Sequence, residues 1–363
     1  MTTAQQMYNI NLDQIGALIK ATGHKRTTLV QGHMGTGKSS LLSTLAKELP
    51  THTACYFDCT TKDLGDITLP NIQTADGQGY VTYATNEELG AHIQAPIILM
   101  VDEYGKANPS VKLALLRLML ERKIGSYELH PDSIVFATTN LGAEGVGDLL
   151  TPHARNRITV VTARKPSNME WIEWGINNDV DHTMLGWCKD NPQLFLGFED
   201  VKDPEENPYI YHPRSQRAAF VTPRSLEAAS DLLKQREFLD DQTVTGALMG
   251  TIGDRAAMDL MAFVALSDQL PSLQSIKDDP ATAKVPDSAA AVCMVVYRTL
   301  ASLERDWIDP WMDYLNRLDK EAQGMFANGV RAPKYSKQGM VMTNKKFTAW
   351  ALQNNYLFAA DVQ

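Results

Sequence analysis

Residues 27–49 read TTLVQGHMGTGKSSLLSTLAKEL, a short β-rich run followed by a glycine loop and then by a helical pattern. Within this stretch, residues 32–39 (GHMGTGKS) fit the pattern GxxxxGK[ST]. Glycines let the backbone curl until its N–H groups face a phosphate chain, and the N-terminus of the following helix adds the positive end of its dipole. A strand before the loop and a helix after it are the context that this pattern requires. We therefore predict a phosphate-binding loop rather than a structural glycine turn.

The residues of this loop have different expected roles in holding a nucleoside triphosphate. We expect Lys38 to contact the β- and γ-phosphates and the Ser39 hydroxyl to ligate Mg²⁺. The predicted cofactors are therefore ATP and Mg²⁺. The predicted nucleotide-binding residues are Gly32, Gly35, Thr36, Gly37, Lys38, Ser39, Ser40 and Asp102, with Ser39 and Asp102 as the metal-binding pair.

Polar residues stand where two further apolar runs end. The run IILMV (residues 97–101) is followed by Asp102 and Glu103, and the run SIVFATT by Asn140. These strands alternate with helical patterns, which predicts a parallel sheet covered by helices on both faces. In such sheets ligands bind at the carboxyl ends of the strands. Because Gly32, Asp102 and Asn140 all end strands, we expect one site to collect them.

The residues at these strand ends suggest a hydrolytic site. Asp102 is expected to hold Mg²⁺ through water, Glu103 to polarise the attacking water, and Asn140 to position that water or the γ-phosphate. The competing interpretations are an acidic turn after a strand and, for Asn140, an ordinary turn former. The phosphate loop upstream favours the catalytic interpretation.

Three arginines are further candidates. Arg155 and Arg157, in LLTPHARNRI, precede the strand ITVVTA, where an arginine is able to act in trans on a neighbouring subunit's transition state. Surface arginines are the alternative. Arg224, in Thr222-Pro223-Arg224, would lie in the first turn of a helix, an unfavourable place for a cation beside the helix dipole. A bound triphosphate would offset that cost, which favours a functional role.

Composition excludes several classes of protein. The chain has 363 residues, enough for two or three domains, and its 44% apolar and 21% charged residues are typical of a globular protein. No stretch approaches the roughly 18 unbroken apolar residues of a membrane span, and the N-terminus lacks the layout of a secretory signal, so we expect a cytoplasmic protein. A net charge of −9 without a basic run argues against general nucleic-acid binding. An oligomer with a local basic channel remains the alternative interpretation.

The four cysteines are too few for a disulfide framework in a chain of this size. Cys55 and Cys59, in ACYFDC, are expected to point with Phe57 toward a core. No second Cys/His pair stands at ligand spacing and no HExxH occurs, so a zinc enzyme is not indicated.

Patterning along the chain predicts its organisation. Residues 9–22 predict one amphipathic helix closed by Gly23, whereas residues 60–85 form a polar, glycine-containing region. After residue 165 the pattern becomes helical, with a capping box at Ser167. The predicted domains are an α/β nucleotide-binding domain (1–165), a helical lid (166–240) and a helical C-terminal extension (241–363).

Taken together, these residues resemble the AAA+ ATPases, which are P-loop NTPases with an all-α lid, and most closely their MoxR branch. DEYGKANPSVKLALLRLMLERKI (residues 102–124) is similar to the family's DE-x-x-(K/R)-A-x-P-x-x-x-x-ALL run, and FVTPRSLEAASDLL (residues 220–233) to its sensor-2 helix. The resemblance covers about residues 5–235 and is faint beyond them. The finger loop departs from the family, with HARNRI in place of a sequence such as L-D-R-F. We favour Arg157 over Arg155 because it stands just before the strand.

The resemblance implies a hexameric ring with ATP at the subunit interfaces. It also implies that hydrolysis remodels or activates a protein client, often with a partner that carries a von Willebrand A domain. By analogy, pore-facing elements are expected in residues 60–85 and 123–132, and nothing in residues 241–363 identifies the client. The alternatives are a DNA-directed motor or loader, which the acidic balance disfavours, and a non-hydrolysing nucleotide-gated binding module, which Glu103 disfavours.

Overall fold

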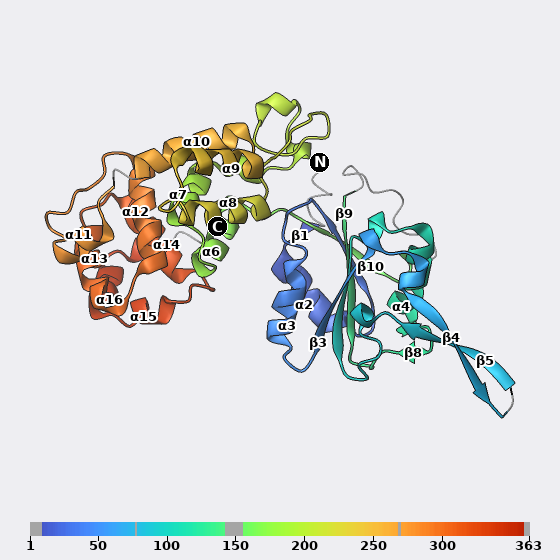
Figure 1. The fold of residues 1–363 in the computed structure, drawn as a ribbon. Coiled ribbons are helices and arrows are strands. Elements are labelled where there is room, and N and C mark those ends of the chain that lie inside the picture. The colour runs from blue at the N-terminus through green and yellow to red at the C-terminus, as the bar shows by residue number, and fades with distance from the viewer. Residues whose placement is uncertain (1–8, 77, 142–154, 268–269, 359–363) are drawn as a thin grey trace. The chain divides into compact units, whose positions relative to one another are not determined.

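The computed structural model describes residues 9–76, 78–141, 155–267 and 270–358 (Figure 1). The chain divides into two compact units, Met1–Lys165 and Pro166–Gln363. The first unit contains the phosphate loop and the second unit is helical.

A parallel six-stranded sheet in the order β1-β10-β2-β9-β6-β3 forms the centre of the first unit (Figure 1). Helices cover both faces of this sheet, and a helical region follows it in the chain, as the sequence predicts. The strands are β1 (Asn9–Ile10), β2 (Thr28–Gly32), β3 (Thr53–Asp58), β6 (Ile97–Asp102), β9 (Ile134–Asn140) and β10 (Thr159–Ala163).

Alternate residues of the strands supply two separate cores. On one face, Phe57, Val101 and their neighbours pack against α4 (Pro109–Glu121) through residues such as Leu115. On the other face, Val30, Met100 and Phe136 pack against α2 (Leu12–Thr22) and α3 (Ser40–Glu48). Because both faces are buried, the central strands are apolar along almost their whole length.

The order of the strands brings three of the predicted positions to one edge of the sheet. Strand β2 ends at Gly32, β6 at Asp102 and β9 at Asn140. Gly32 pairs with Asn140, and β9 lies between β2 and β6. The glycine loop, the acidic pair and the asparagine therefore share the carboxyl edge.

Two boundaries in this unit differ from the prediction. The predicted helix over residues 9–22 begins only at Leu12, because Asn9 and Ile10 pair with β10 and Asn11 caps the helix. Gly23 ends this helix with a negative φ, so it is not needed for a left-handed turn. A side chain there would meet Ile134 and the carbonyl of Ile19 at 2.6 Å, so close packing requires the glycine.

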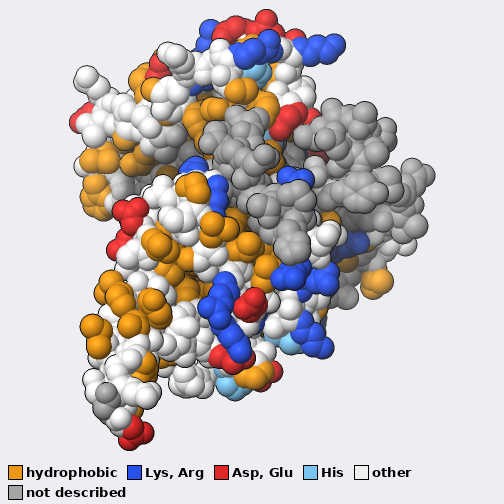
Figure 2. All heavy atoms as spheres, turned by 90° about the vertical axis from the view of Figure 1, so that its right-hand side faces the viewer, with side chains coloured by type: hydrophobic (Ala, Val, Ile, Leu, Met, Phe, Trp, Pro, Cys, Tyr) orange, Lys and Arg blue, Asp and Glu red, His pale blue; other side chains and the backbone are white. Residues whose placement is uncertain are grey.

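The polar region of residues 60–85 contains a hairpin that the sequence pattern does not predict. Strands β4 (Thr68–Ala75) and β5 (Gln78–Thr85) pair in antiparallel register, and nearly all their side chains are exposed. Figure 2 shows hydrophobic side chains along this arm. The large apolar ones are Leu69, Ile72, Tyr80, Val81 and Tyr83, which are 45–78% exposed. A second hairpin, β7 (Lys123–Ile124) and β8 (Tyr127–Glu128), approaches the base of the arm, where the Ser126 hydroxyl accepts a hydrogen bond from the Tyr83 N–H.

The second unit is a helical assembly around one core. The Ser167 capping box forms as predicted. The core runs across residue 240 without a break, and the predicted division there stays a prediction. The helices are α6 (Asn168–Asn177), α7 (His182–Asp190), α8 (Pro223–Lys234), α9 (Asp241–Ile252), α10 (Asp254–Ser267), α11 (Leu273–Asp278), α12 (Ala289–Ser302), α13 (Ile308–Leu315), α14 (Lys320–Arg331), α15 (Gln338–Met342) and α16 (Lys345–Gln353).

Short 3-10 helices connect many of these elements. In the first unit they are η1 (Cys59–Thr61), η2 (Leu64–Asp66), η3 (Glu87–Leu89) and η4 (Tyr104–Lys106). In the second unit they are η6 (Pro192–Phe195), η7 (Phe198–Asp200), η8 (Pro204–Glu206), η9 (Arg305–Trp307) and η10 (Asn355–Phe358). None of the helices in the described ranges is both long and apolar enough to cross a membrane.

Candidate functional site

The glycine loop between β2 and α3 has the backbone that its sequence predicts. Gly35 and Gly37 adopt φ angles of 70° and 91°, in the left-handed region that favours glycine. The Thr36 hydroxyl donates to the His33 carbonyl at 2.9 Å and stabilises the curled loop from inside. The glycines are thus needed for the curled conformation of the loop.

The N-terminus of α3 follows this loop without an acidic side chain in its first turn. Ser39 occupies the cap position, yet its side chain does not cap the helix. The Ser40 hydroxyl donates to the Gly37 carbonyl at 2.7 Å. A helix start with no carboxylate of its own is suited to bind an anion such as a phosphate.

Lys38 is buried, with 7% of its surface exposed, and its ammonium group lies beneath the loop. Its Nζ donates to the carbonyls of Gly32 at 2.9 Å and His33 at 2.7 Å, and to Asn140 Oδ1 at 3.0 Å. These neutral oxygens accept hydrogen bonds from a buried cation. Phosphate oxygens would be stronger partners for the same N–H donors.

Asp102 ends β6, where its carboxylate is almost fully buried. Its Oδ1 accepts the Glu103 N–H at 3.0 Å and the Thr138 hydroxyl. Its Oδ2 accepts the Tyr56 hydroxyl at 3.0 Å and lies 3.5 Å from the Ser39 hydroxyl oxygen. The predicted metal-binding pair, Ser39 and Asp102, is therefore brought together.

Glu103 follows directly and has φ 51° and ψ 35°, a left-handed conformation that is uncommon for a residue other than glycine. Its Oε1 and Oε2 lie 3.1 and 3.4 Å from Asn140 Nδ2. Lys106, in η4, places its ammonium group 3.1 Å from Oε2. Strained backbone of this kind costs about 1–3 kcal/mol and is concentrated at functional sites.

Asn140 connects the two halves of the site. Its Oδ1 accepts a hydrogen bond from Lys38, while its Nδ2 donates to Glu103. Both contacts agree on the orientation of the amide, since an ammonium group only donates and a carboxylate only accepts. A continuous path of hydrogen bonds thus runs from the phosphate loop to the acidic residue.

The carboxylates at these strand ends create a negative potential. Burial and then the charges of Asp58, Asp102 and Glu103 raise the pKa of Cys59 to about 12. Burial, followed by the charge of Asp102 and the hydrogen bond to it, also raises the pKa of Tyr56. Such a potential attracts a cation.

The oxygen atoms present fit a magnesium ion better than a metal that needs a full protein cage. Among the described residues no three His, Cys, Asp or Glu side chains gather into a group able to hold a metal. Mg²⁺ is usually bound by one or two protein oxygen ligands together with waters and substrate phosphates. The Ser39 and Asp102 oxygens beside the phosphate loop match that requirement.

None of the hydrogen bonds described above involves a predicted arginine. Arg155 and Arg157 are both exposed on the segment before β10. The first part of their loop, residues 149–154, lies outside the described residues. Arg224 is exposed in the first turn of α8, in the second unit. Thr222 and Ser225, which stand before and after it in sequence, form the capping box of that helix. The roles of these arginines stay predictions.

Sequence reasoning does not identify Tyr56, Thr138 and Lys106 as parts of the site. Val101 pairs with Ala137, so the residues that follow, Asp102 and Thr138, lie side by side on neighbouring strands. That relation depends on the strand order, which the sequence does not provide. Lys106 stands three residues after Glu103. This spacing predicts an ion pair between the two side chains only where the chain forms a helical turn, and the sequence does not predict a turn there.

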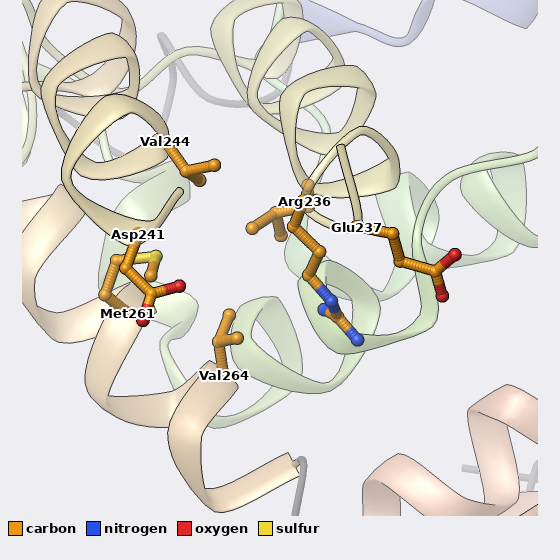
Figure 3. A pocket seen from close by; sticks show the side chains of 7 residues that line it. Arg236, Glu237, Asp241, Val244, Met261 and Val264 are labelled. Atoms are coloured by element: carbon orange, nitrogen blue, oxygen red, sulfur yellow. The ribbon is translucent and has the colours of Figure 1, made fainter. Parts of the chain in front are cut away.

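A separate cavity of about 300 Å³ lies within the second unit (Figure 3). Arg236 and Asp241 lie on opposite sides of it. It is lined by Leu233, Arg236, Glu237, Asp241, Val244, Met261 and Val264. None of the predicted site residues lines it.

No protein-family model matches the chain, and no curated protein matches it. The solved structures with partial similarity include the following three. A protein from Cytophaga hutchinsonii is 18% identical over 47% of this chain and 52% of its own, with a TM-score of 0.35. A RuvB mutant from Thermotoga maritima is 15% identical over 69% and 67%, with a TM-score of 0.35. S. cerevisiae Hsp104 with ADP is 20% identical over 64% and 35%, with a TM-score of 0.36.

The chain therefore spans about half the length of the Cytophaga protein and about a third of Hsp104.

Proposed function

We propose that the chain is an ATPase of the AAA+ type that depends on Mg²⁺ and hydrolyses ATP at the carboxyl edge of its parallel sheet. The observation that supports this most strongly is the path of hydrogen bonds from Lys38 through Asn140 to Glu103. It joins a loop suited to phosphates with a carboxylate suited to accept a proton.

In this proposal the residues of the site have distinct roles in binding and hydrolysis. The loop amides and Lys38 would bind the phosphate chain, and Ser39 and Asp102 would hold a magnesium ion. When bound, that ion neutralises charge on the phosphate oxygens. Glu103 would accept a proton from the water as its oxygen bonds to the terminal phosphorus, while the bond from that phosphorus to the bridging oxygen breaks and ADP leaves. Asn140 would orient the carboxylate and the terminal phosphate.

The strained backbone of Glu103 supports hydrolysis over simple nucleotide binding. A binding module has no need of a carboxylate that stands on a left-handed backbone and is held in place by two neighbouring side chains. Holding a proton acceptor in a fixed position is what catalysis of hydrolysis requires.

We further propose a ring, hexameric as in the MoxR branch, in which an arginine of one subunit reaches the ATP of the next. The exposure of Arg157 and Arg155 supports this, since a residue that acts on a neighbour has to be accessible. Arg224, in the predicted lid, is a further candidate for a catalytic arginine. The work of the ring would be to remodel or activate a protein client, together with a partner that carries a von Willebrand A domain.

Assembly tests the ring. We expect ATP, and not ADP, to promote a ring that is measurable by sedimentation or light scattering. A chain that stays monomeric with every nucleotide would contradict this part of the proposal.

The trans arginine has its own test. Arg157→Ala should abolish turnover while ATP still binds, whereas Arg155→Ala serves as the neighbouring control and should retain turnover. Mixing Arg157→Ala with Glu103→Gln should restore activity at those interfaces that combine one intact arginine with one intact glutamate. Equal loss in both arginine variants, or no recovery on mixing, would argue against Arg157.

Capture of partners distinguishes the client classes. The Glu103→Gln variant, held with ATP, should retain a protein partner. Recovery of nucleic acid in place of protein would favour a DNA-directed motor.

A further inference from the structure

We infer that Tyr56 is a positioning residue for the metal at this site, acting through the Asp102 carboxylate. This inference rests on the proposed function. Tyr56 lies on β3, the edge strand next to β6, and its hydroxyl donates to Asp102 Oδ2 at 3.0 Å.

The two oxygens of Asp102 have different surroundings. Oδ1 is held by groups from β6 and β9, namely the Glu103 N–H and the Thr138 hydroxyl. Oδ2 is the oxygen that approaches Ser39, the other residue suited to the metal. Oδ2 is therefore the oxygen that would face a bound ion or its water.

Tyr56 makes the shorter of the two contacts to Oδ2. The Tyr56 bond is 3.0 Å, whereas the Ser39 contact is 3.5 Å, the long limit of a hydrogen bond. A hydroxyl that donates to a charged oxygen at 3.0 Å restrains rotation of the carboxylate about its Cβ–Cγ bond. Tyr56 therefore fixes Oδ2 as the Thr138 hydroxyl fixes Oδ1.

The position of Tyr56 in the strand explains how it reaches Asp102. Asp58 pairs with Asp102, and Tyr56 pairs with Met100, so Tyr56 is a diagonal neighbour of Asp102 within reach of a long side chain. Cys55 and Phe57 point into the core on the other face, whereas Tyr56 remains 46% exposed. Its ring contributes little to the core, and its hydroxyl is the part with a defined partner.

The expected size of the effect follows from other metal sites. Removing a group that hydrogen-bonds a metal ligand typically weakens metal affinity 10- to 100-fold. The variant Tyr56→Phe keeps the exposed ring and removes only the hydroxyl, so folding should be preserved.

The experiment measures metal binding directly. Mn²⁺ replaces Mg²⁺ as the probe, and its binding is followed by electron paramagnetic resonance in the presence of a non-hydrolysable ATP analogue. Affinity for the same analogue in EDTA is measured alongside. Tyr80→Phe is the matched control, since Tyr80 is 51% exposed on the β4–β5 arm.

We expect Tyr56→Phe to bind Mn²⁺ at least tenfold more weakly, with unchanged affinity for the analogue in EDTA, and Tyr80→Phe to equal the wild type. Mn²⁺ affinity within twofold of the wild type in Tyr56→Phe would overturn the inference. Equal losses with and without metal would also overturn it, because the tyrosine would then support the loop as a whole. Failure of the wild type itself to bind the analogue would instead overturn the proposed function, and the inference with it.

Discussion

The side-chain amide of Asn140 uses both of its ends, with its oxygen on Lys38 and its nitrogen on Glu103. Each end faces a charged group, and charge-assisted hydrogen bonds are about twice as strong as neutral ones. A movement of Lys38 therefore shifts the position of the Glu103 carboxylate, because the rigid side-chain amide of Asn140 is bonded to both. This makes Asn140 the residue whose loss should separate binding from turnover.

We expect Asn140→Ala to lower kcat by roughly 10²-fold, the usual cost of losing one preorganised hydrogen-bond donor in an active site. Binding of ATP should change little, because the loop amides and the two loop carbonyl partners of Lys38 remain. Steady-state kinetics and nucleotide titration measure the two effects. Asn71→Ala, on the exposed arm, is the control, and equal kcat in both variants would contradict the role of Asn140.

The sequence identifies those site residues that belong to a motif or to a recognisable local pattern. Lys38, Asp102 and Asn140 are found because a motif or the end of an apolar run identifies each of them. Tyr56 and Thr138 are missed because they reach Asp102 across neighbouring strands. Strand order is a property of the folded sheet, so no local pattern contains it.

Among the elements, the buried strands are predictable and the exposed ones are not. Strands β6 and β9 are buried along their whole length and therefore appear as apolar runs. Strands β4 and β5 are almost fully exposed, so neither burial nor alternation distinguishes them from a polar loop. Strand β1 has only two residues, and its pairing with β10 depends on a segment far away in the sequence.

One partly buried arginine joins three elements of the first unit. Arg122 ends α4 in a left-handed conformation. Its guanidinium group donates to the Thr27 hydroxyl at 2.6 Å, to the Gly23 carbonyl at 2.7 Å and to the Met119 carbonyl. Burial lowers its pKa to about 10, so it still carries its charge at neutral pH. It thereby connects the ends of α2 and α4 with the start of β2.

Arg122→Ala should lower the free energy of unfolding by about 2 to 4 kcal/mol, because buried acceptors would lose their donors. Arg117→Ala on the same helix is the control. Its ion pair with Glu121 is solvent-exposed, so we expect a loss of no more than about 0.5 kcal/mol. Urea unfolding followed by circular dichroism compares the two variants. Similar losses of unfolding free energy in both variants would show that the hydrogen bonds of Arg122 do not stabilise the unit.

In the whole molecule, the two units contain separate cores, and all four cysteines are buried in them. Burial raises the pKa of Cys55 and Cys188, and that of Cys293 despite the nearby Lys189. With the pKa of Cys59 near 12, the reactive thiolate form is disfavoured at all four positions at neutral pH.

A thiol reagent should therefore label none of the cysteines in the native protein at pH 7 to 8, and all four after denaturation. Labelling remains slow as the pH rises through the ordinary thiol range, because the folded-state pKa values lie above it. Mass spectrometry counts the modified residues. Rapid modification of one cysteine in the folded chain would show that its surroundings are more open than described.

ATP turnover by the wild type and by Glu103→Gln, under matched concentrations of Mg²⁺ and ATP, is the most direct test of the proposed hydrolysis. The glutamine keeps the shape of the side chain and a hydrogen bond to Asn140, but it does not accept a proton at neutral pH. Glu121→Gln, on the exposed end of α4, is the control. We predict turnover in the wild type and the control, and a loss of at least about 10²-fold in Glu103→Gln with ATP still bound. Normal hydrolysis by Glu103→Gln, or none by the wild type, would contradict the account.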